Sequence, residues 1–396
     1  MNEIRRIVII NVIFILIFLG PLGVVGTAEA ISHSEPSFNS MQEGVVWDSI
    51  EHDYSSSYAV FRDISFINET HGWIVGENGT GIKGGIILHT NDGGVTWNLQ
   101  LYNETQSFRH IEVIDQNTLW TTGDGGLFYT FNAGSTWNYL SIDALSTDST
   151  ISTVEFFNNT YGWTAADGSI FATTNGGMNW ESGPSWPFDE DRPRMFHFIS
   201  DSEVWCIGYY GIYHSTNGGE TWLQRFNKGG WAFSFVSNRE AWAVADGMLA
   251  HYVDGESWND LPLPRSPSGS LVDPPYFTDI LFLDANQGWI AGLETQIAYT
   301  NNGGIDWYQQ KVAGSGIERI MSLDMINSTH GWATGTWGII LRTSTGTSLG
   351  ELLQIRIPIV LLLSIFGAGI VMVVITIGGF IFRSRRRRKQ KIPEIE

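Results

Sequence analysis

The stretch Ile64–Trp97, ISFINETHGWIVGENGTGIKGGIILHTNDGGVTW, is the unit from which most of the chain is built. Its first mark is a tryptophan that opens a short apolar segment, as in Gly72–Gly76. The mark recurs at intervals of 37 to 47 residues, at Trp73, Trp120, Trp163, Trp205, Trp242, Trp289 and Trp332. Self-similarity with such a period is typical of a solenoid, an array or a propeller.

The second mark, Thr90–Trp97, contains a hydroxyl residue, then Asn or Asp with glycine, and ends in Trp. It recurs at Thr130–Trp137, Thr173–Trp180, Ser215–Trp222 and Thr300–Trp307, and in a degraded form at His251–Trp258. The pattern predicts a tight turn between antiparallel strands. The Asn or Asp side chain would bond turn amides, glycine would take positive φ, and Trp would cover the core of the next blade. Only one acidic or amide group per copy is fixed, which favours a structural turn over a metal site.

Each copy divides into four short segments that alternate or run apolar, which in the first copy are about 60–67, 72–76, 85–90 and 96–101. Period-two patterns predict strands, and four strands in about 45 residues are typical of a propeller blade. Seven copies therefore predict an all-β, seven-bladed β-propeller over residues 44–346. The seventh copy lacks its fourth strand, while segment 44–50, with Trp47, has no blade of its own. We expect this N-terminal strand to close the last blade and so remove an open edge.

The strings Gly-Trp-x-x-Gly and Thr-x-Asp-Gly-Gly-x-Thr-Trp over 44–346 resemble those of the photosystem II assembly and stability factor family, and the turn resembles the Asp-box of BNR-repeat propellers. Sortilin-type receptors and sialidases share this box. The resemblance implies a propeller that binds or assembles proteins without catalysing a reaction. The apolar C-terminal segment is a departure from the family, and nothing in the sequence indicates photosynthesis.

Both ends of the chain carry membrane signals. Residues 1–30 combine a basic start, an apolar run and Ala28-Glu29-Ala30, which predicts a cleaved signal peptide, with an uncleaved anchor as the alternative. After a juxtamembrane linker, 347–358, the uncharged segment 359–382 predicts one transmembrane helix. The basic segment 383–396 predicts a cytoplasmic tail. The expected topology is a single-pass type I protein of the cell membrane with an extracytoplasmic propeller.

Acidic residues dominate the composition, with 41 Asp+Glu against 22 Lys+Arg and a net charge of −19. The excess is greater between the two basic ends, which argues against nucleic acid as a partner. The single cysteine, Cys206, excludes an intrachain disulfide, and its apolar surroundings predict a buried residue rather than a nucleophile. Five sequons predict glycosylation sites if the host glycosylates, although Asn and Thr are also common turn residues: Asn68, Asn78, Asn103, Asn158 and Asn327.

The candidate ligand-binding residues occupy one repeat position, eleven residues before each strand-two Trp. Arg62, Arg109, Arg194 and Trp231 hold it in four copies and would surround the mouth of the central channel. Arginine suits carboxylate or amide partners, and tryptophan suits interface packing. The alternative is that the arginines form ion pairs between blades, with Asp63, Glu112 or Glu155. Two long loops lead into first strands on the same face. One, 182–193, carries Trp186, and the other is 261–276. Both could instead be tolerated insertions.

We expect no catalytic residues, no metal and no cofactor. Arg62, Arg109 and Arg194 could imitate the arginine triad of a sialidase, but no Tyr–Glu nucleophile pair can be assigned, and the only Arg-Ile-Pro string, at 356–358, lies beside the predicted span. The favoured function is a membrane-anchored scaffold that binds proteins, with a membrane-protein client as a candidate partner. The alternatives are a structural or adhesion module at the cell surface and, less favoured, a sialidase-like glycoside hydrolase.

Overall fold

The computed structural model describes residues 46–56, 58–78, 84–245, 247–253, 255, 257–261, 263, 276–293, 296–313, 318–347 and 351–353. The chain divides into two compact units, Met1–Ile355 and Arg356–Glu396. The second unit lies outside the described residues, as do the predicted signal peptide, transmembrane helix, basic tail and most of loop 261–276. Within the described part, no helix is long and apolar enough to cross a bilayer.

The named elements of the described residues are β-strands, arranged in seven antiparallel sheets. Blade 1 consists of β2 (Ala59–Phe66), β3 (Gly72–Asn78), β4 (Gly85–Thr90) and β5 (Asn98–Asn103). Blade 2 consists of β6 (Ile111–Val113), β7 (Leu119–Thr122), β8 (Gly126–Thr130) and β9 (Asn138–Ser141). Blade 3 consists of β10 (Ile151–Phe156), β11 (Gly162–Ala166), β12 (Ser169–Thr173) and β13 (Glu181–Ser182). Blades 4 and 5 consist of β14 (Pro193–Phe198), β15 (Val204–Gly208), β16 (Ile212–Ser215) and β17 (Leu223–Phe226); and β18 (Gly230–Ser237), β19 (Glu240–Ala245), β20 (Met248–Val253) and β21 (Ser257–Leu261).

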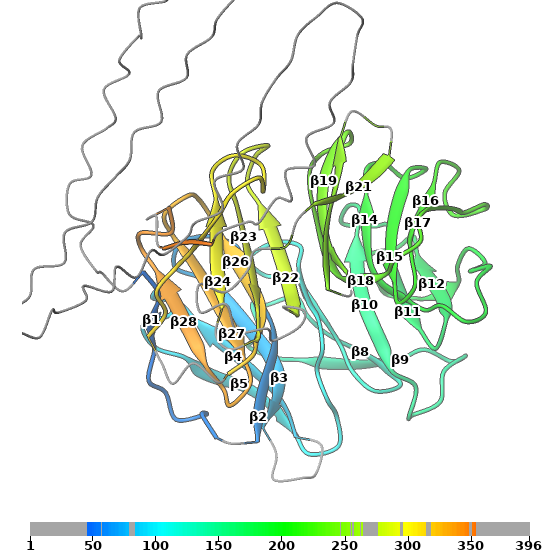
Figure 1. Cartoon of the computed structure of the whole chain (residues 1–396). Helices are drawn as coiled ribbons and strands as arrows, with labels where there is room; N and C mark the ends of the chain where they lie inside the picture. The colour runs from blue at the N-terminus through cyan, green and yellow to red at the C-terminus, as the bar shows by residue number, and fades with distance from the viewer. Residues whose placement is uncertain are drawn as a thin grey trace, which may run out of the picture. The chain divides into compact units, whose positions relative to one another are not determined.

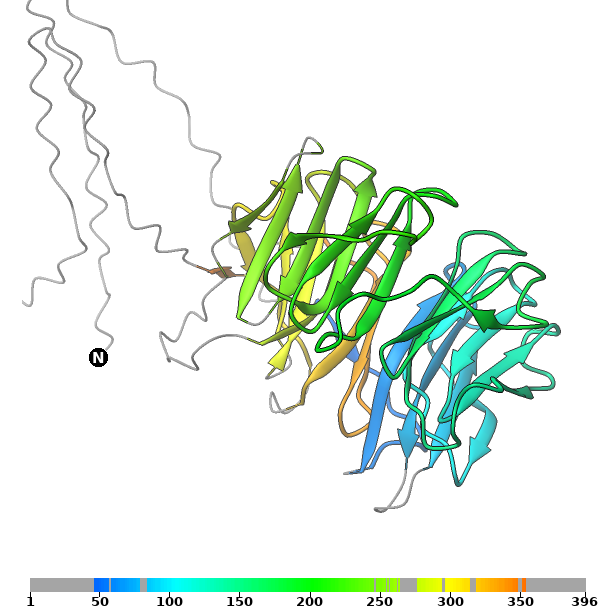
Figure 2. The same cartoon turned by 90° about the vertical axis from the view of Figure 1, so that its right-hand side faces the viewer.

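The ring closes through blade 7, which contains strands from both ends of the propeller. Blade 6 consists of β22 (Phe277–Phe282), β23 (Gly288–Gly292), β24 (Ile297–Thr300) and β25 (Trp307–Gln309), and blade 7 of β26 (Ile320–Met325), β27 (Gly331–Gly335), β28 (Ile340–Thr343) and β1 (Asp48–Ser49). The first strands of successive blades contact each other, and β26 contacts β2. Figures 1 and 2 show the blue strands of blade 1 beside the orange strands of blade 7. The predicted seven-bladed propeller and its closure by the N-terminal strand are therefore confirmed.

Closure also involves blade 6. The backbone N–H of Val46 donates to Lys311, and Ala313 donates to the carbonyl of Trp47, so the N-terminal segment pairs with the chain that leaves blade 6. A strand that the repeat pattern did not predict, β29 (Glu351–Leu353), pairs with β25 and gives blade 6 five strands. Segments from both ends of the described chain thus pair at blades 6 and 7.

The core lies between blades rather than within them. Seven clusters of buried side chains occur in the described residues, one at each interface between neighbouring blades. Each strand-two Trp is at most 1% exposed and faces the following blade. Each turn Trp faces the preceding blade, as Trp97 does in packing with Trp332 of blade 7. The expectation that the turn Trp covers the next blade is wrong, because spacing along the chain does not determine which face of a sheet a side chain covers.

The two sequence marks contact each other across blade interfaces. The indole Nε1 of Trp332 donates to the carbonyl of Gly93, 2.9 Å away, in the turn of blade 1. In that turn Thr90 Oγ1 accepts from the backbone N–H of Gly94, and the carboxylate of Asp92 accepts from Thr96, as predicted. Gly94 has φ +80°, and a Cβ there would meet the Trp332 ring at 2.8 Å. Glycine is therefore required both for the turn and for the close approach of the indole.

Candidate binding site

The predicted site position coincides with a repeated backbone irregularity. In six blades the pairing of the first and second strands shifts register at this residue, which is Arg62, Ser152, Arg194, Trp231, Thr278 or Met321. Arg109 lies two residues before β6. A bulge inserts one extra residue into a strand and redirects its side chain. The position lies near the start of each first strand, on the face that also carries the loops between second and third strands. We call this side of the ring face A.

Blades 4 and 5 bring two of the predicted residues together. The guanidinium carbon of Arg194 lies 3.7 Å from the ring centroid of Trp231 and 4.1 Å from that of Tyr209. Its NH1 group donates to the carbonyl of Gly230 at 3.3 Å. The side chains of Tyr209, Tyr210 and Trp231 are 49%, 62% and 38% exposed. We call Arg194, Tyr209, Tyr210 and Trp231 the blade 4–5 patch.

A buried carboxylate holds the turn that presents these tyrosines. Asp191 is 3% exposed and accepts from the backbone N–H of Tyr209 at 2.6 Å, from that of Tyr210 at 3.1 Å and from the Tyr213 hydroxyl at 2.6 Å. The predicted Trp186 contributes here only indirectly, because its indole Nε1 donates to the carbonyl of Asp191 at 3.0 Å. Its ring packs in the core between blades 3 and 4. Loop 182–193 therefore positions the patch rather than adding a contact surface through Trp186.

The other two predicted arginines have different surroundings. Arg62 forms an ion pair of 2.8 Å with Glu77, on the neighbouring strand of its own blade. The Nε atom of Arg109 is buried and has no hydrogen-bond partner among the described residues. The anticipated ion pairs of these arginines with Asp63, Glu112 and Glu155 do not occur in the described part of the chain, where the charged partner of Asp63 and Glu155 is His110.

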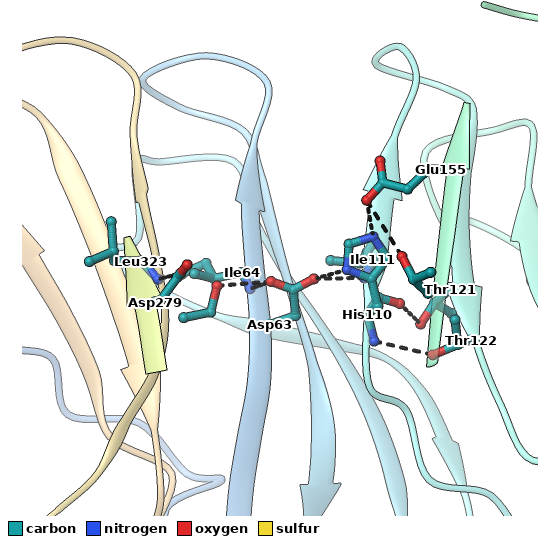
Figure 3. Close-up of polar contacts among 11 residues, drawn as sticks. Asp63, Ile64, His110, Ile111, Thr121, Thr122, Glu155, Asp279 and Leu323 are labelled. Atoms are coloured by element: carbon teal, nitrogen blue, oxygen red, sulfur yellow. Dashed lines mark hydrogen bonds and ion pairs between the residues drawn. The ribbon is translucent and has the colours of Figure 1, made fainter. Parts of the chain in front are cut away.

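The first strands carry polar side chains that tie neighbouring blades together. The inner edge of each first strand has backbone N–H groups without a partner in its own sheet, and such groups need an acceptor when buried. Asp63 Oδ2 accepts from the N–H of Ile111 in blade 2, and its Oδ1 accepts from the Ser322 hydroxyl in blade 7, both at 2.9 Å (Figure 3). Equivalent bonds join Leu323 to Asp279, Phe66 to Asp324 and Phe282 to Ser234.

A cluster of titratable groups lies beside these ties. The Nδ1 of His110 lies 2.9 Å from Asp63 Oδ2, and its Nε2 lies 3.4 Å from Glu155 Oε1 (Figure 3). Burial lowers the pKa of His110, but the carboxylates of Asp63 and Glu155 outweigh this effect and raise it well above 6.5. Burial, with repulsion by Glu155, raises the pKa of Glu112 to about 8. Burial also raises the pKa of Asp279 and of Asp324 to about 7.

The sequon asparagines lie in or beside turns. Asn68 Oδ1 accepts from the backbone N–H groups of Thr70 and His71, both at 2.9 Å, and Asn158 and Asn327 make the same turn. Asp115 has this role in blade 2. Asn103 forms a similar turn with Thr105, and Asn78 ends β3. The turn accounts for most of these residues without a glycan, and their glycosylation stays a prediction.

The fold and the repeated turn define an Asp-box β-propeller, and the comparisons specify its family. The family model described as Photosynthesis system II assembly factor YCF48 matches residues 39–145 and 257–359, more than half of the chain. The chain therefore belongs to this family. The unmatched central segment contains the blade 4–5 patch.

Known proteins show the same relationship. The chain is 21% identical over 295 residues to the chloroplastic photosystem II stability/assembly factor HCF136 of Oryza sativa subsp. japonica, a match that covers 71% of this chain and 66% of the rice protein. A solved structure of YCF48 bound to D1 peptide is similar with TM-score 0.60 and 20% identity, over 77% of this chain and 98% of that one. A catalytically inactive virginiamycin B lyase from Staphylococcus aureus has TM-score 0.60 and 11% identity, over 75% and 98%. At these identities the structures show a shared fold.

Proposed function

We propose that this protein is a non-catalytic scaffold that binds a protein partner through the blade 4–5 patch. The observation that carries the proposal is the stacking of the Arg194 guanidinium between Tyr209 and Trp231, with both aromatic rings exposed. Arginine, tyrosine and tryptophan are the residues that most often dominate the binding energy of protein interfaces.

The arrangement of the patch suits a peptide segment. Stacking on the two rings keeps the guanidinium in one orientation. The exposed rings beside it offer apolar surface. Further exposed aromatic side chains on face A, outside the patch, are Tyr58, Tyr276 and Trp337.

Family membership supports the same class of function. The rice relative is a stability and assembly factor, and the solved YCF48 holds a D1 peptide. We propose that this chain likewise engages a segment of a membrane-protein client, without extending the photosystem client to it. The lyase among the structural neighbours shares only the fold, and the patch offers no nucleophile paired with a general base.

The cellular arrangement is part of the proposal. The predicted signal peptide and transmembrane helix would anchor the chain as a type I membrane protein with the propeller extracytoplasmic. Protease added to intact cells should then remove the propeller and spare the Arg-rich tail. A propeller that resists protease in intact cells, but not in lysed ones, would contradict this topology.

The binding site is tested by capture of the native client with the full chain purified from its own membranes. Trp231→Ala should reduce the recovered client about tenfold or more, because a central aromatic residue contributes roughly 2 kcal/mol or more. Trp337→Ala is the matched control, since it removes an exposed tryptophan from face A of blade 7. The triple replacement of Arg62, Arg109 and Arg194 by alanine tests the wider channel mouth.

The outcomes separate the alternatives. Equal capture by the wild type and Trp231→Ala, at equal melting temperature, would place the binding surface elsewhere. Loss in the triple variant without loss in Trp231→Ala would move the site from the patch to Arg62 and Arg109. A similar loss in Trp337→Ala would show that face A binds as a whole.

A further inference from the structure

The first strands of blades 1 to 3 bring together one imidazole and three carboxylates that the proposed binding function does not use. His110 precedes β6, Glu155 comes from β10 and Asp63 from β2 (Figure 3). Glu112 lies within β6. One potential ligand atom from each of His110, Glu112 and Glu155 lies within 4.8 Å of the others. We propose that these three side chains bind one divalent transition-metal ion, of which Zn²⁺ is the best fit, and that this ion links blades 2 and 3.

The spacing of the donor atoms fits a shared metal better than a hydrogen bond. The Nε2 atom of His110 is buried and has no hydrogen-bond partner among the described residues, although Glu155 Oε1 is 3.4 Å away. An N–H···O bond to a carboxylate is normally about 2.7–2.9 Å long. Two donors bound to one tetrahedral zinc by bonds of about 2.0–2.2 Å lie about 3.3–3.6 Å apart. The observed separation falls within that range.

The orientation of the imidazole gives a second, independent indication. The other ring nitrogen, Nδ1, lies 2.9 Å from Asp63 Oδ2 and is placed to donate its proton there. Histidine ligands of metals almost always donate the second ring N–H to a carboxylate or carbonyl in this way. A metal ion at Nε2 would take the place of the proton that the imidazolium holds between this nitrogen and Glu155, and it would leave Nδ1–H donating to Asp63.

The charge of the cluster favours a cation. Asp63, Glu112 and Glu155 surround one imidazole, and none of them forms an ion pair with lysine or arginine within the described ranges. Burial makes three like charges costly. The mixed nitrogen and oxygen donors suit zinc or cobalt better than calcium or magnesium, which prefer oxygen alone. Asp63 would be a positioning residue and not a ligand.

The test is a titration of the tag-free full chain, stripped with a chelator, with Co²⁺ and then with competing Zn²⁺. We expect one equivalent of Co²⁺ with the visible absorption of a tetrahedral site, displaced by Zn²⁺. Glu112→Gln and Glu155→Gln should each weaken binding by tenfold or more, and Asp63→Asn by about 10–100-fold. Glu240→Gln is the matched control, because His251 Nε2 and Glu240 Oε1 are similarly spaced, at 3.3 Å, but belong to no three-residue cluster in the described residues.

Absence of Co²⁺ uptake by the wild type would overturn the proposal and leave a proton as the cation of the cluster. Undiminished binding by both glutamine variants would also overturn it. X-ray absorption of the zinc-loaded wild type does not depend on the folding of any variant. One imidazole with two or more oxygen ligands would support the site, and two or more imidazoles would refute it. The result is independent of client capture by the blade 4–5 patch.

Discussion

Replacing Trp47 by alanine should destabilise the propeller by about 4–6 kcal/mol. The side chain is 0% exposed and packs between blades 6 and 7. Loss of a buried tryptophan costs about 3–5 kcal/mol through lost burial and the remaining cavity. The indole Nε1 also donates to Gln310 Oε1 at 2.7 Å, and loss of this hydrogen bond adds about 1 kcal/mol.

The assay is thermal unfolding of the full chain in detergent, followed by near-ultraviolet circular dichroism. A large domain loses about 2 °C of melting temperature per kcal/mol, so Trp47→Ala should melt about 8–12 °C below the wild type. Trp337→Ala is the matched control, because its side chain is 43% exposed and its loss should cost less than about 1 kcal/mol.

The reasoning would be refuted if Trp47→Ala melted within about 2 °C of the wild type. That result would mean that the N-terminal segment adds little to closure, and that β28 tolerates an open edge. Deletion of residues 31–50 provides a second test, because it removes β1 as well as the indole and should lower the melting temperature at least as far.

Three further predictions concern the turns and the polar ties. Gly177→Ala should lower the free energy of unfolding in urea by about 3 kcal/mol or more, because the new Cβ would lie 2.2 Å from the Trp120 ring. Gly168→Ala is the control with a similar φ, and it should cost about 1 kcal/mol because the nearest atom is 3.9 Å away. Equal costs would contradict the clash. Asp63→Ala should lower the free energy of unfolding by about 3–5 kcal/mol, because it removes the acceptor of the Ile111 N–H in blade 2 and of the Ser322 hydroxyl in blade 7. An unchanged melting temperature would show that these donors find other acceptors. Burial raises the pKa of Asp279 from 3.8 to about 7, so between these pH values the folded state binds a proton that the unfolded state has lost. The free energy of unfolding should therefore decline as pH rises through this window, by up to about 1.4 kcal/mol per pH unit. Asp279→Asn should flatten the decline, and identical slopes for the variant and the wild type between pH 5 and 8 would contradict the prediction.

The sequence predicted the ring well because its marks are spaced by a physical repeat. Each blade needs a buried indole on its second strand and a turn that lets this indole approach, so both features recur and can be counted. The closing strand followed from the same count, since one copy lacked a strand and Trp47 lacked a blade. The strand β29 carries neither mark, and its pairing with β25 depends on the position of the chain after blade 7.

The candidate site was less predictable, because equivalence of position does not determine the partners of a side chain. Arg62 and Arg194 share a bulged position, yet one lies beside Glu77 and the other between two aromatic rings. Tyr209 lies in a loop outside the repeat marks, where the buried Asp191 accepts from its backbone N–H. His110 follows Arg109 directly and so holds the repeat position that Asp63 and Asp279 hold in their own blades, and this equivalence was the available signal.

Closure of the ring by the N-terminal strand has a consequence for biosynthesis. Asp48 pairs with Arg342, so the ribosome must add almost 300 residues before the partner of β1 exists. At about 5–20 residues per second, this delay is roughly 15–60 s. Until blade 6 is made, the indole of Trp47 and the backbone of the closing segment have no native partner, while earlier blades can already pack on each other. The nascent chain therefore exposes an apolar N-terminal segment with unpaired backbone groups until translation is nearly complete. A chaperone that shields this segment would need to bind early and dissociate late.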